Sequence, residues 1–188
     1  MVMKYFFLII YYSLLRYLPS NSCIIKPIGK ICGKLRYYCC SHIFKKCGKD
    51  VGIERLAQFG SGKDIVIGDR SNLGINCKVP SDIEIGNDVM MGPNFCCYTS
   101  NHNYDRTDIP MNQQGHTPRT KLKIGSDIWI GCDVLLLPGG EIPDGCVVAA
   151  RSVITRQFPT YSIIGGVPAK VIKNRKESIN KDSNRTII

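Results

Sequence analysis

The residues of this chain best suited to chemistry are its three histidines, His42, His102 and His116. His102 and His116 belong to one polar stretch, which opens at residues 98–105 with the sequence Tyr-Thr-Ser-Asn-His-Asn-Tyr-Asp. An imidazole is neutral near pH 7 and can take up a proton, so histidine acts as a general base with little adjustment. A histidine in this stretch could therefore remove a proton from a hydroxyl group.

Metal and thiol chemistry find little support in the sequence. A catalytic zinc site needs about three protein ligands, and the polar stretch offers two histidines without a His-x-x-x-x-His spacing. The ten cysteines include no Cys-x-x-Cys pair, and Cys77, Cys97 and Cys146 stand where small or apolar residues recur. We predict reduced, structural thiols and no metal. No glycine-rich phosphate loop opens a helix, which argues against nucleoside-triphosphate chemistry.

The polar stretch interrupts a repeat in which an apolar residue returns at every sixth position. These positions are Ile67, Leu73, Val79, Ile85, Met91 and Cys97 before the stretch, and Ile124, Ile130, Leu136, Ile142, Val148 and Ile154 after it. The next position is glycine in six of the twelve cases, at Gly68, Gly74, Gly86, Gly92, Gly125 and Gly131. The two blocks are 27 residues apart, which is not a multiple of six. Residues 101–121 are therefore expected to form a loop outside the repeat.

A period of six fits neither an isolated helix nor a hairpin strand, but it fits a β-solenoid of short stacked strands. The apolar position points inward, and glycine is expected to supply positive φ at the corners. The repeat begins weakly near Val51, slips by two residues at Ser61-Gly62 and then runs regularly. The period alone does not decide the handedness of the coil.

The charge of the chain is concentrated at its two ends. Residues 1–50 contain nine basic residues (lysine or arginine) and one acidic residue. Residues 51–172 contain eleven basic and twelve acidic residues, and residues 173–188 contain five basic and two acidic residues. We therefore divide the chain into a basic, apolar helical segment (1–49), a repeat domain (50–175) and a basic tail (176–188). A neutral body argues against nucleic-acid binding. Basic ends fit an anionic membrane surface or a phosphorylated ligand.

The N-terminal segment is expected to be helical and to lie at a surface. The apolar run between Lys4 and Arg16 has eleven residues, too few to span a bilayer as a helix. A signal peptide is disfavoured because no small-x-small cleavage site follows. The run could lie on a membrane, pack on another subunit or form part of the core. Residues 26–49 predict an amphipathic helix, whose basic face would comprise Lys26, Lys30, Lys34, Arg36, Lys45, Lys46 and Lys49. We expect a cytoplasmic protein that is either free in the cytoplasm or peripheral to the inner face of the cell membrane.

Four segments resemble the hexapeptide-repeat acyltransferases. They are Ile67-Gly68-Asp69, Ile85-Gly86-Asn87-Asp88-Val89-Met90-Met91-Gly92-Pro93-Asn94, Ile124-Gly125-Ser126-Asp127-Ile128-Trp129-Ile130-Gly131 and Gly165-Gly166-Val167-Pro168-Ala169-Lys170-Val171-Ile172. The resemblance covers residues 50–175 and is nearest to maltose, galactoside, capsular and lipopolysaccharide O-acetyltransferases. It implies an all-β fold, a left-handed parallel β-helix with three strands per coil. It also implies a homotrimer that binds acetyl-CoA between subunits and acetylates a saccharide hydroxyl in capsule, lipopolysaccharide or exopolysaccharide synthesis.

The resemblance also assigns roles to individual residues. His102 aligns with the general base, and either Asp105 or a backbone carbonyl would orient its ring. Asn76 and Asn94, at corners expected to face the same edge as His102, are candidate acceptor contacts, although asparagine is common at tight corners. Trp129 would stand beside the active site, and His116 is either a substrate contact or a solvated loop residue. The residues implied to bind acetyl-CoA are Cys132, Ala150, Thr155, Arg156, Pro168, Lys170 and Lys173.

Three other functions remain open from the sequence. N-acetylation of an amino sugar nucleotide needs the same base and donor. A zinc enzyme like the hexapeptide carbonic anhydrases would need about three imidazoles, which this region does not offer. A non-catalytic β-helix binding subunit would be favoured by a missing His102, and that residue is present.

Overall fold

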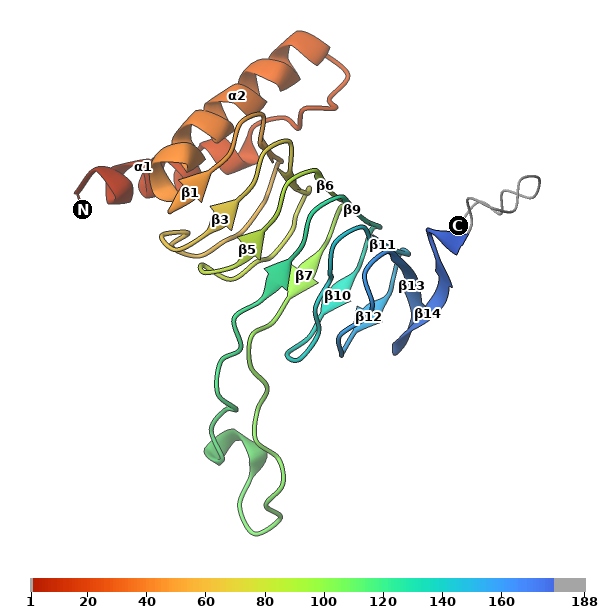
Figure 1. Ribbon diagram of the computed structural model, residues 1–188. Coiled ribbons are helices and arrows are strands. Elements are labelled where there is room, and N and C mark those ends of the chain that lie inside the picture. Colours follow the sequence, from red (N-terminus) through yellow and green to blue (C-terminus); the bar gives the residue numbers. More distant parts are fainter. Residues whose placement is uncertain (1, 178–188) are drawn as a thin grey trace.

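The computed structural model describes residues 2–177, which form two helices followed by a stack of short strands (Figure 1). The helical elements are α1 (Val2–Ser13), η1 (Leu15–Tyr17), α2 (Lys26–Ile43) and η2 (Met111–Gln113). The strands are β1 (Lys46–Cys47), β2 (Gly52–Ile53), β3 (Val66–Ile67), β4 (Asn72–Leu73), β5 (Glu84–Ile85), β6 (Val89–Met91), β7 (Cys96–Cys97), β8 (Lys123–Ile124), β9 (Ile128–Ile130), β10 (Leu135–Leu136), β11 (Val147–Val148), β12 (Val153–Ile154), β13 (Ser162–Gly166) and β14 (Ala169–Asn174). No helix within residues 2–177 is long and apolar enough to cross a membrane.

The strands pair in parallel between successive coils. Val66 pairs with Glu84 and Leu135 with Val153, so partners in adjacent coils are 18 residues apart. Across the polar loop the spacing becomes 39, as between Cys96 and Leu135, so 21 extra residues leave the stack. The ladders form three faces: β1-β3-β5-β8, then β2-β4 continued by β6-β9-β11-β13-β14, then β7-β10-β12. A coil of three strands is what the resemblance to the hexapeptide-repeat acyltransferases implies.

The first coil begins earlier than the sequence suggested. Lys46 pairs with Val66 at a spacing of 20 residues, and the two extra residues lie in the turn at Ser61-Gly62. The slip predicted there is present. The boundary expected at residue 50 is displaced, because α2 ends at Ile43 and β1 already joins the ladder of β3.

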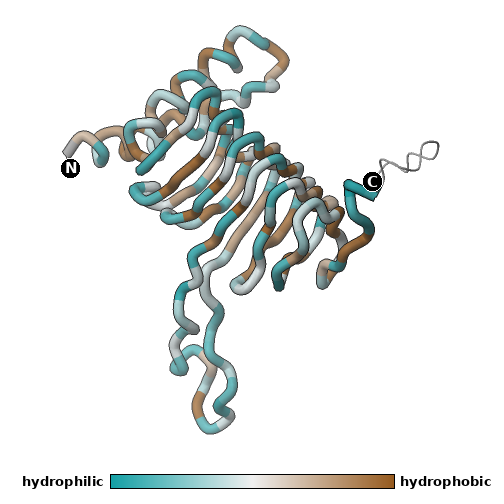
Figure 2. The backbone as a smooth tube through the Cα atoms, in the orientation of Figure 1, coloured by the Kyte–Doolittle hydropathy of each residue, from teal (hydrophilic) through white to brown (hydrophobic). Residues whose placement is uncertain are grey.

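All twelve sixth-position residues are buried, and a second buried column lies two residues before each of them. The second column contains Ile65, Ser71, Cys77, Ile83, Val89 and Phe95 before the loop, and Leu122, Ile128, Val134, Gly140, Cys146 and Ser152 after it. Ser71 is tolerated there because its hydroxyl donates to the Gly86 carbonyl (2.7 Å) and accepts from the Val89 amide (3.1 Å). Figure 2 shows the resulting apolar segments along the coils and the largely hydrophilic loop.

The expectation that the repeat glycines supply positive φ at the corners is wrong. Left-handed conformations fall two residues later, mostly on asparagine and aspartate, which tolerate them. Examples are Asn76 (φ 54°), Asp88 (φ 58°), Asn94 (φ 60°), Asp127 (φ 56°) and Asp133 (φ 57°). The six repeat glycines have ordinary φ values, and they are glycine because the next coil's backbone passes too close for a Cβ atom.

Replacing Gly74 with alanine is expected to destabilise the fold by about 1–3 kcal/mol, the usual cost of overpacking. A Cβ at Gly74 would overlap the Gly92 carbonyl oxygen and lie 2.7 Å from that of Met91. Both atoms belong to backbone that cannot rotate away. Gly52→Ala is the matched control, since its nearest obstacle is the Asn72 Cβ atom at 3.1 Å. Urea unfolding of both variants measures the difference, and equal midpoints would contradict the close-approach explanation.

The helices close the N-terminal end of the stack (Figure 1). Tyr11 of α1 donates to the Ala57 carbonyl (3.0 Å), and its ring packs on Phe59 (4.6 Å between centroids). Arg36 of α2 is 0% exposed. The sequence placed Arg36 on the basic face, which is wrong: the guanidinium turns inward and donates to backbone carbonyls beneath the helix.

Candidate active site

The polar loop leaves the stack after β7, returns at β8 and projects away from the coils (Figure 1). Its two limbs are joined at the root. The Asn103 amide donates to the Gly115 carbonyl (3.0 Å), and the Thr117 amide donates to the Asn101 carbonyl (2.8 Å). This pairing makes a short antiparallel ribbon whose directly opposed residues are His102 and His116. The candidate base therefore stands on a hydrogen-bonded ribbon.

The rings of His102 and His116 lie side by side, with centroids 4.1 Å apart and an angle of 40° between the planes. Both residues are exposed. Sequence reasoning gave His116 a minor place, but the ribbon makes it the nearest ring to the candidate base. Within residues 2–177 no hydrogen bond joins Asp105 to His102. An orienting role for Asp105 therefore has no geometric support within one chain.

Two ion pairs hold the returning limb of the loop against the preceding coil. Arg119 lies 3.3 Å from the Asp82 carboxylate, and the Lys121 ammonium lies 2.5 Å from that of Glu84. The hydrogen bond from Lys121 lowers the pKa of the Glu84 carboxyl group. Exposed pairs of this kind contribute little to stability, so their effect is to favour one position of the limb.

A shallow cleft of about 300 Å³ lies on a different part of the stack, beside Trp129. Trp129 points outward from β9 and is 48% exposed, as its position in the repeat predicts. Cys132 and Ala150 also line the cleft, and the other lining residues are Gly92, Pro93, Ile130, Gly131, Val147, Val148 and Ala149. The structure thus brings together Trp129 and two of the residues expected to bind a cofactor.

The asparagines Asn76 and Asn94 are on the corner near this cleft and not on the edge that carries the loop. Asn76 follows β4 and Asn94 follows β6, whereas the loop follows β7 on the next corner of the coil. Their side chains form a ladder in which Asn76 donates to Asn94 (3.0 Å) and Asn94 donates to Asp133 (2.8 Å). The expectation that they share an edge with His102 in one chain is therefore wrong, because six residues along a coil lead to a different corner.

The remaining cofactor candidates are divided between two places. Thr155 and Arg156 follow β12 at the corner from which the loop also leaves, and both are exposed. Pro168, Lys170 and Lys173 belong to the exposed hairpin of β13 and β14 at the far end of the stack. Ala169, beside them, is only 2% exposed and packs in the core.

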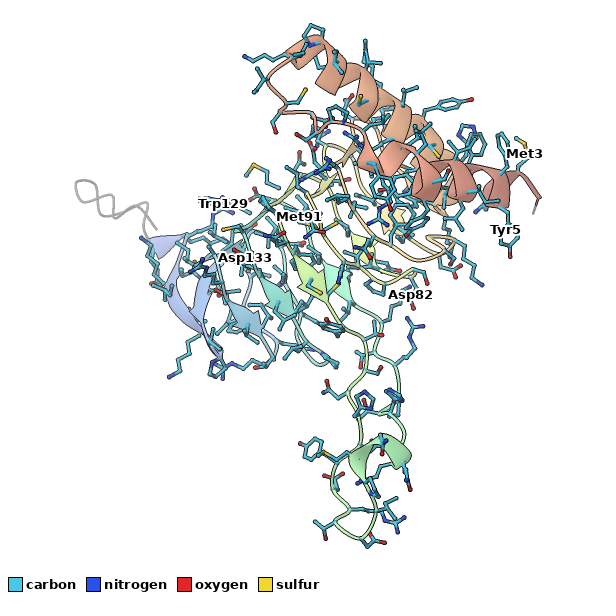
Figure 3. The ribbon with its side chains drawn as sticks, turned by 180° about the vertical axis from the view of Figure 1, so that it is seen from behind. Met3, Tyr5, Asp82, Met91, Trp129 and Asp133 are labelled. Carbon is cyan, nitrogen blue, oxygen red and sulfur yellow. The ribbon has the colours of Figure 1, made fainter. Side chains whose placement is uncertain are left out.

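One chain alone does not assemble the candidate base with the cleft. Viewed from behind, Trp129 and Asp133 lie on the far side of the coils from the loop, whose root is near Asp82 (Figure 3). The loop projects away from its own coils (Figure 1), and His102 is not among the residues that line the cleft.

The cysteines and acidic residues suggest no other chemistry. All ten cysteines are free. Burial raises the pKa of the Cys77 thiol to about 12 and that of the Cys39 thiol to about 11, so both are protonated and unreactive at neutral pH. Among residues 2–177, no group of three or more histidine, cysteine or acidic side chains is placed to hold a metal ion.

Comparison with known proteins finds acetyltransferases that are similar to this chain in sequence and in structure. No family model matches the chain. A probable acetyltransferase of Mycobacterium tuberculosis is 40% identical over 119 residues, which are 62% of this chain and 37% of that protein. The galactoside O-acetyltransferase of Escherichia coli is 28% identical over 133 residues, 70% of this chain and 64% of that protein. A maltose O-acetyltransferase structure from Clostridium difficile is 27% identical, has a TM-score of 0.66, and matches 92% of this chain and 82% of its own. This chain is a homologue of the hexapeptide-repeat acetyltransferases.

Within this family, a galactoside acetyltransferase solved with coenzyme A shares the fold with a TM-score of 0.75 at 21% identity, over 99% of this chain and 88% of its own. That match includes the N-terminal helices. The chain spans between 37% and 64% of the length of the two curated relatives described above. The resemblance read from the repeat segments is thus confirmed at the level of the family.

Proposed function

We propose that this protein is an acetyl-CoA-dependent O-acetyltransferase that acts on a saccharide hydroxyl. The observation that carries the proposal is the pair of features on adjacent corners of one coil. One is an imidazole on a rigid ribbon, and the other is an apolar cleft beside Trp129. The homologous galactoside and maltose O-acetyltransferases support this reaction.

In the proposed reaction, His102 removes the proton from the sugar hydroxyl as its oxygen attacks the thioester carbonyl. A carbon–oxygen bond forms, the carbon–sulfur bond breaks, and the departing thiolate takes the proton from the imidazolium. No acyl-enzyme is needed, which agrees with a cleft that contains an exposed thiol, Cys132, but no histidine among its lining residues. A positioned base of this kind contributes about 10²–10⁴ in rate.

The complete site would form between copies in a homotrimer, as the resemblance implies. The loop of one subunit would bring His102 to the Trp129 cleft of its neighbour, while Thr155 and Arg156 on the loop's corner face the same groove. A head-to-tail contact repeated three times closes a ring. The left-handed sense of the coil belongs to the same proposal.

The residues present fit the acyl donor. The cleft is shallow and lined by apolar and small residues, which suits the largely uncharged pantetheine arm. Lys170 and Lys173 are exposed on the hairpin of β13 and β14, where their charges would attract phosphate groups. Pro168 on the same hairpin offers an apolar surface for adenine. Asn76 and Asn94 stay candidates for acceptor contacts from the neighbouring subunit, although each already bonds in a ladder.

We further propose that the acetyltransferase takes part in capsule, lipopolysaccharide or exopolysaccharide synthesis at the inner face of the cell membrane. The basic N-terminal segment would meet the membrane, where lipid-linked glycans are made. N-acetylation of an amino sugar nucleotide is the alternative, and structures of an N-acyltransferase from Bacillus cereus share the fold at 22% identity. Both reactions use the same base and donor.

A thiol-release assay tests the proposed function. Purified protein is mixed with acetyl-CoA and a panel of neutral sugars, amino sugars and sugar nucleotides, and product is identified by mass and alkali lability. We expect thiol release with a hydroxyl acceptor and an ester product. An amide product would establish the N-acetyl alternative, and release with no acceptor in a broad glycan panel would contradict saccharide acetylation.

A further inference from the structure

Helix α2 presents an apolar ridge to solvent in addition to the face that it buries. The buried face comprises Gly29, Cys32, Gly33, Arg36, Cys39, Cys40 and Ile43. On another side of the helix, Ile28, Ile31, Leu35 and Tyr38 follow one another at helical spacing and are 44%, 59%, 46% and 59% exposed. Residues spaced three and four apart share one face of a helix. This apolar ridge is therefore continuous, and about half of its side-chain surface is exposed to solvent within residues 2–177.

A row of lysines runs beside the apolar ridge. Lys26, Lys30 and Lys34 are spaced four residues apart and are all exposed. Lys34 is three residues from Ile31 and four from Tyr38, so the two rows adjoin. Residues 1–49 contain no acidic side chain, so no opposite charge within this segment neutralises the row.

Helix α1 extends the exposed apolar surface. Phe7 stacks on His42 of α2 (4.5 Å between centroids) and meets Tyr38 edge-on (6.1 Å), so the two helices lie side by side. Met3, Phe6 and Ile9 of α1 are 66%, 58% and 68% exposed. Figure 3 shows Met3 and Tyr5 at the outer end of this helix, away from the coils. We call these α1 residues, the apolar ridge and the lysine row together the helical cap surface.

We propose that the helical cap surface binds an anionic membrane, with α2 lying in the plane of the interface. Apolar side chains would enter the acyl boundary while the lysine stems run along it and place their ammonium groups among the lipid phosphates. An exposed apolar patch of this kind marks an interaction site. The lysine row supplies the charge complementarity to an anionic headgroup layer.

The charge distribution favours a membrane over a second copy of the chain. Two helical cap surfaces in contact would bring the lysine rows of both copies together, and residues 1–49 contain no acid to offset them, which is unfavourable. Lysine is also depleted in interfaces between proteins. The surface lies on the end of the stack, so membrane binding leaves the sides of the coils free.

Vesicle co-sedimentation of the full chain tests this proposal. The vesicles are phosphatidylcholine alone or with about 30% phosphatidylglycerol. We expect binding to the anionic vesicles, and at least about tenfold weaker binding for Ile31→Asp/Leu35→Asp and for Lys30→Glu/Lys34→Glu. The control for the ridge variant is Ile172→Asp, because Ile172 lies on β14 and is 59% exposed, as Ile31 is. The control for the lysine variant is Lys63→Glu, because Lys63 is exposed in a turn of the coils. Both controls should bind as the unchanged protein does.

Circular dichroism and native mass accompany each variant. Equal binding by the ridge variants and their controls, or no binding of the unchanged protein, would overturn the proposal. A change of native mass in Ile31→Asp/Leu35→Asp, with vesicle binding unchanged, would instead show an interface between copies. Because co-sedimentation needs no turnover, its result is independent of the acetyltransferase assignment.

Discussion

The His102→Ala variant is expected to release thiol from acetyl-CoA about 10²–10⁴ times more slowly than the unchanged protein. The reason is that the variant keeps the Trp129 cleft but has no group to take the proton from the attacking hydroxyl. Acetyl-CoA binding, measured by calorimetry, should persist, because the loop leaves the coil on a different corner from the cleft. The kcat for thiol release with an accepted sugar measures the loss.

His42→Ala is the matched control for this variant. His42 lies on α2, where its Nδ1 atom is 2.8 Å from the Tyr38 carbonyl oxygen, and it has no place in the proposed site. Full activity is expected in this control. Full activity in His102→Ala would refute the base assignment, whereas loss of both activity and acetyl-CoA binding would point to a structural effect of the loop.

The His102→Ala variant, combined with a second variant, also tests whether the site is shared between subunits. Ala150→Trp should fill the cleft and abolish activity while His102 stays intact. Refolding an equal mixture of the two inactive variants should recover about a quarter of the unchanged activity, since a quarter of neighbouring pairs would combine an intact base with an intact cleft. Formation of mixed trimers without recovery would place both groups in one subunit and contradict the shared site.

Arg36→Met is expected to lower the free energy of unfolding by about 2–4 kcal/mol, because several buried carbonyl groups lose their donor. Nε donates to the Ile53 carbonyl (2.6 Å), and Nη1 donates to the carbonyls of Leu18 (3.2 Å) and Pro19 (3.0 Å). Nη2 donates to the Asn21 amide oxygen (3.3 Å). The guanidinium thus joins α2, the turn before it and the first coil. Urea unfolding followed by circular dichroism gives the change.

Lys34→Met is the matched control, since Lys34 is exposed on the same helix, two residues away. Its unfolding free energy should change by less than about 0.5 kcal/mol. A similarly small change in Arg36→Met would mean that water replaces the guanidinium at those carbonyls, and the buried arginine would then not explain how the helices are held to the coils.

The periodic part of this protein could be predicted because its coil is a local repeat. An apolar residue at every sixth position indicates short stacked strands, and the two-residue slip at Ser61-Gly62 was visible in the register alone. The polar loop and its candidate base were visible for the same reason, as a departure from the period. The role of glycine was misread, because a close approach between coils is a contact between residues 18 apart and leaves no local signal.

What the sequence determined by itself is the repeat and the place where it is interrupted. Through its resemblance to a family, it also led to the prediction that His102 acts as the base. Only the tertiary structure decided which corner each residue occupies. It placed His102 beside His116, separated it from Asn76, Asn94 and Trp129, and turned Arg36 inward. The physical reason is that corner and facing depend on how coils and helices stack, and stacking is set by contacts between residues distant in the chain.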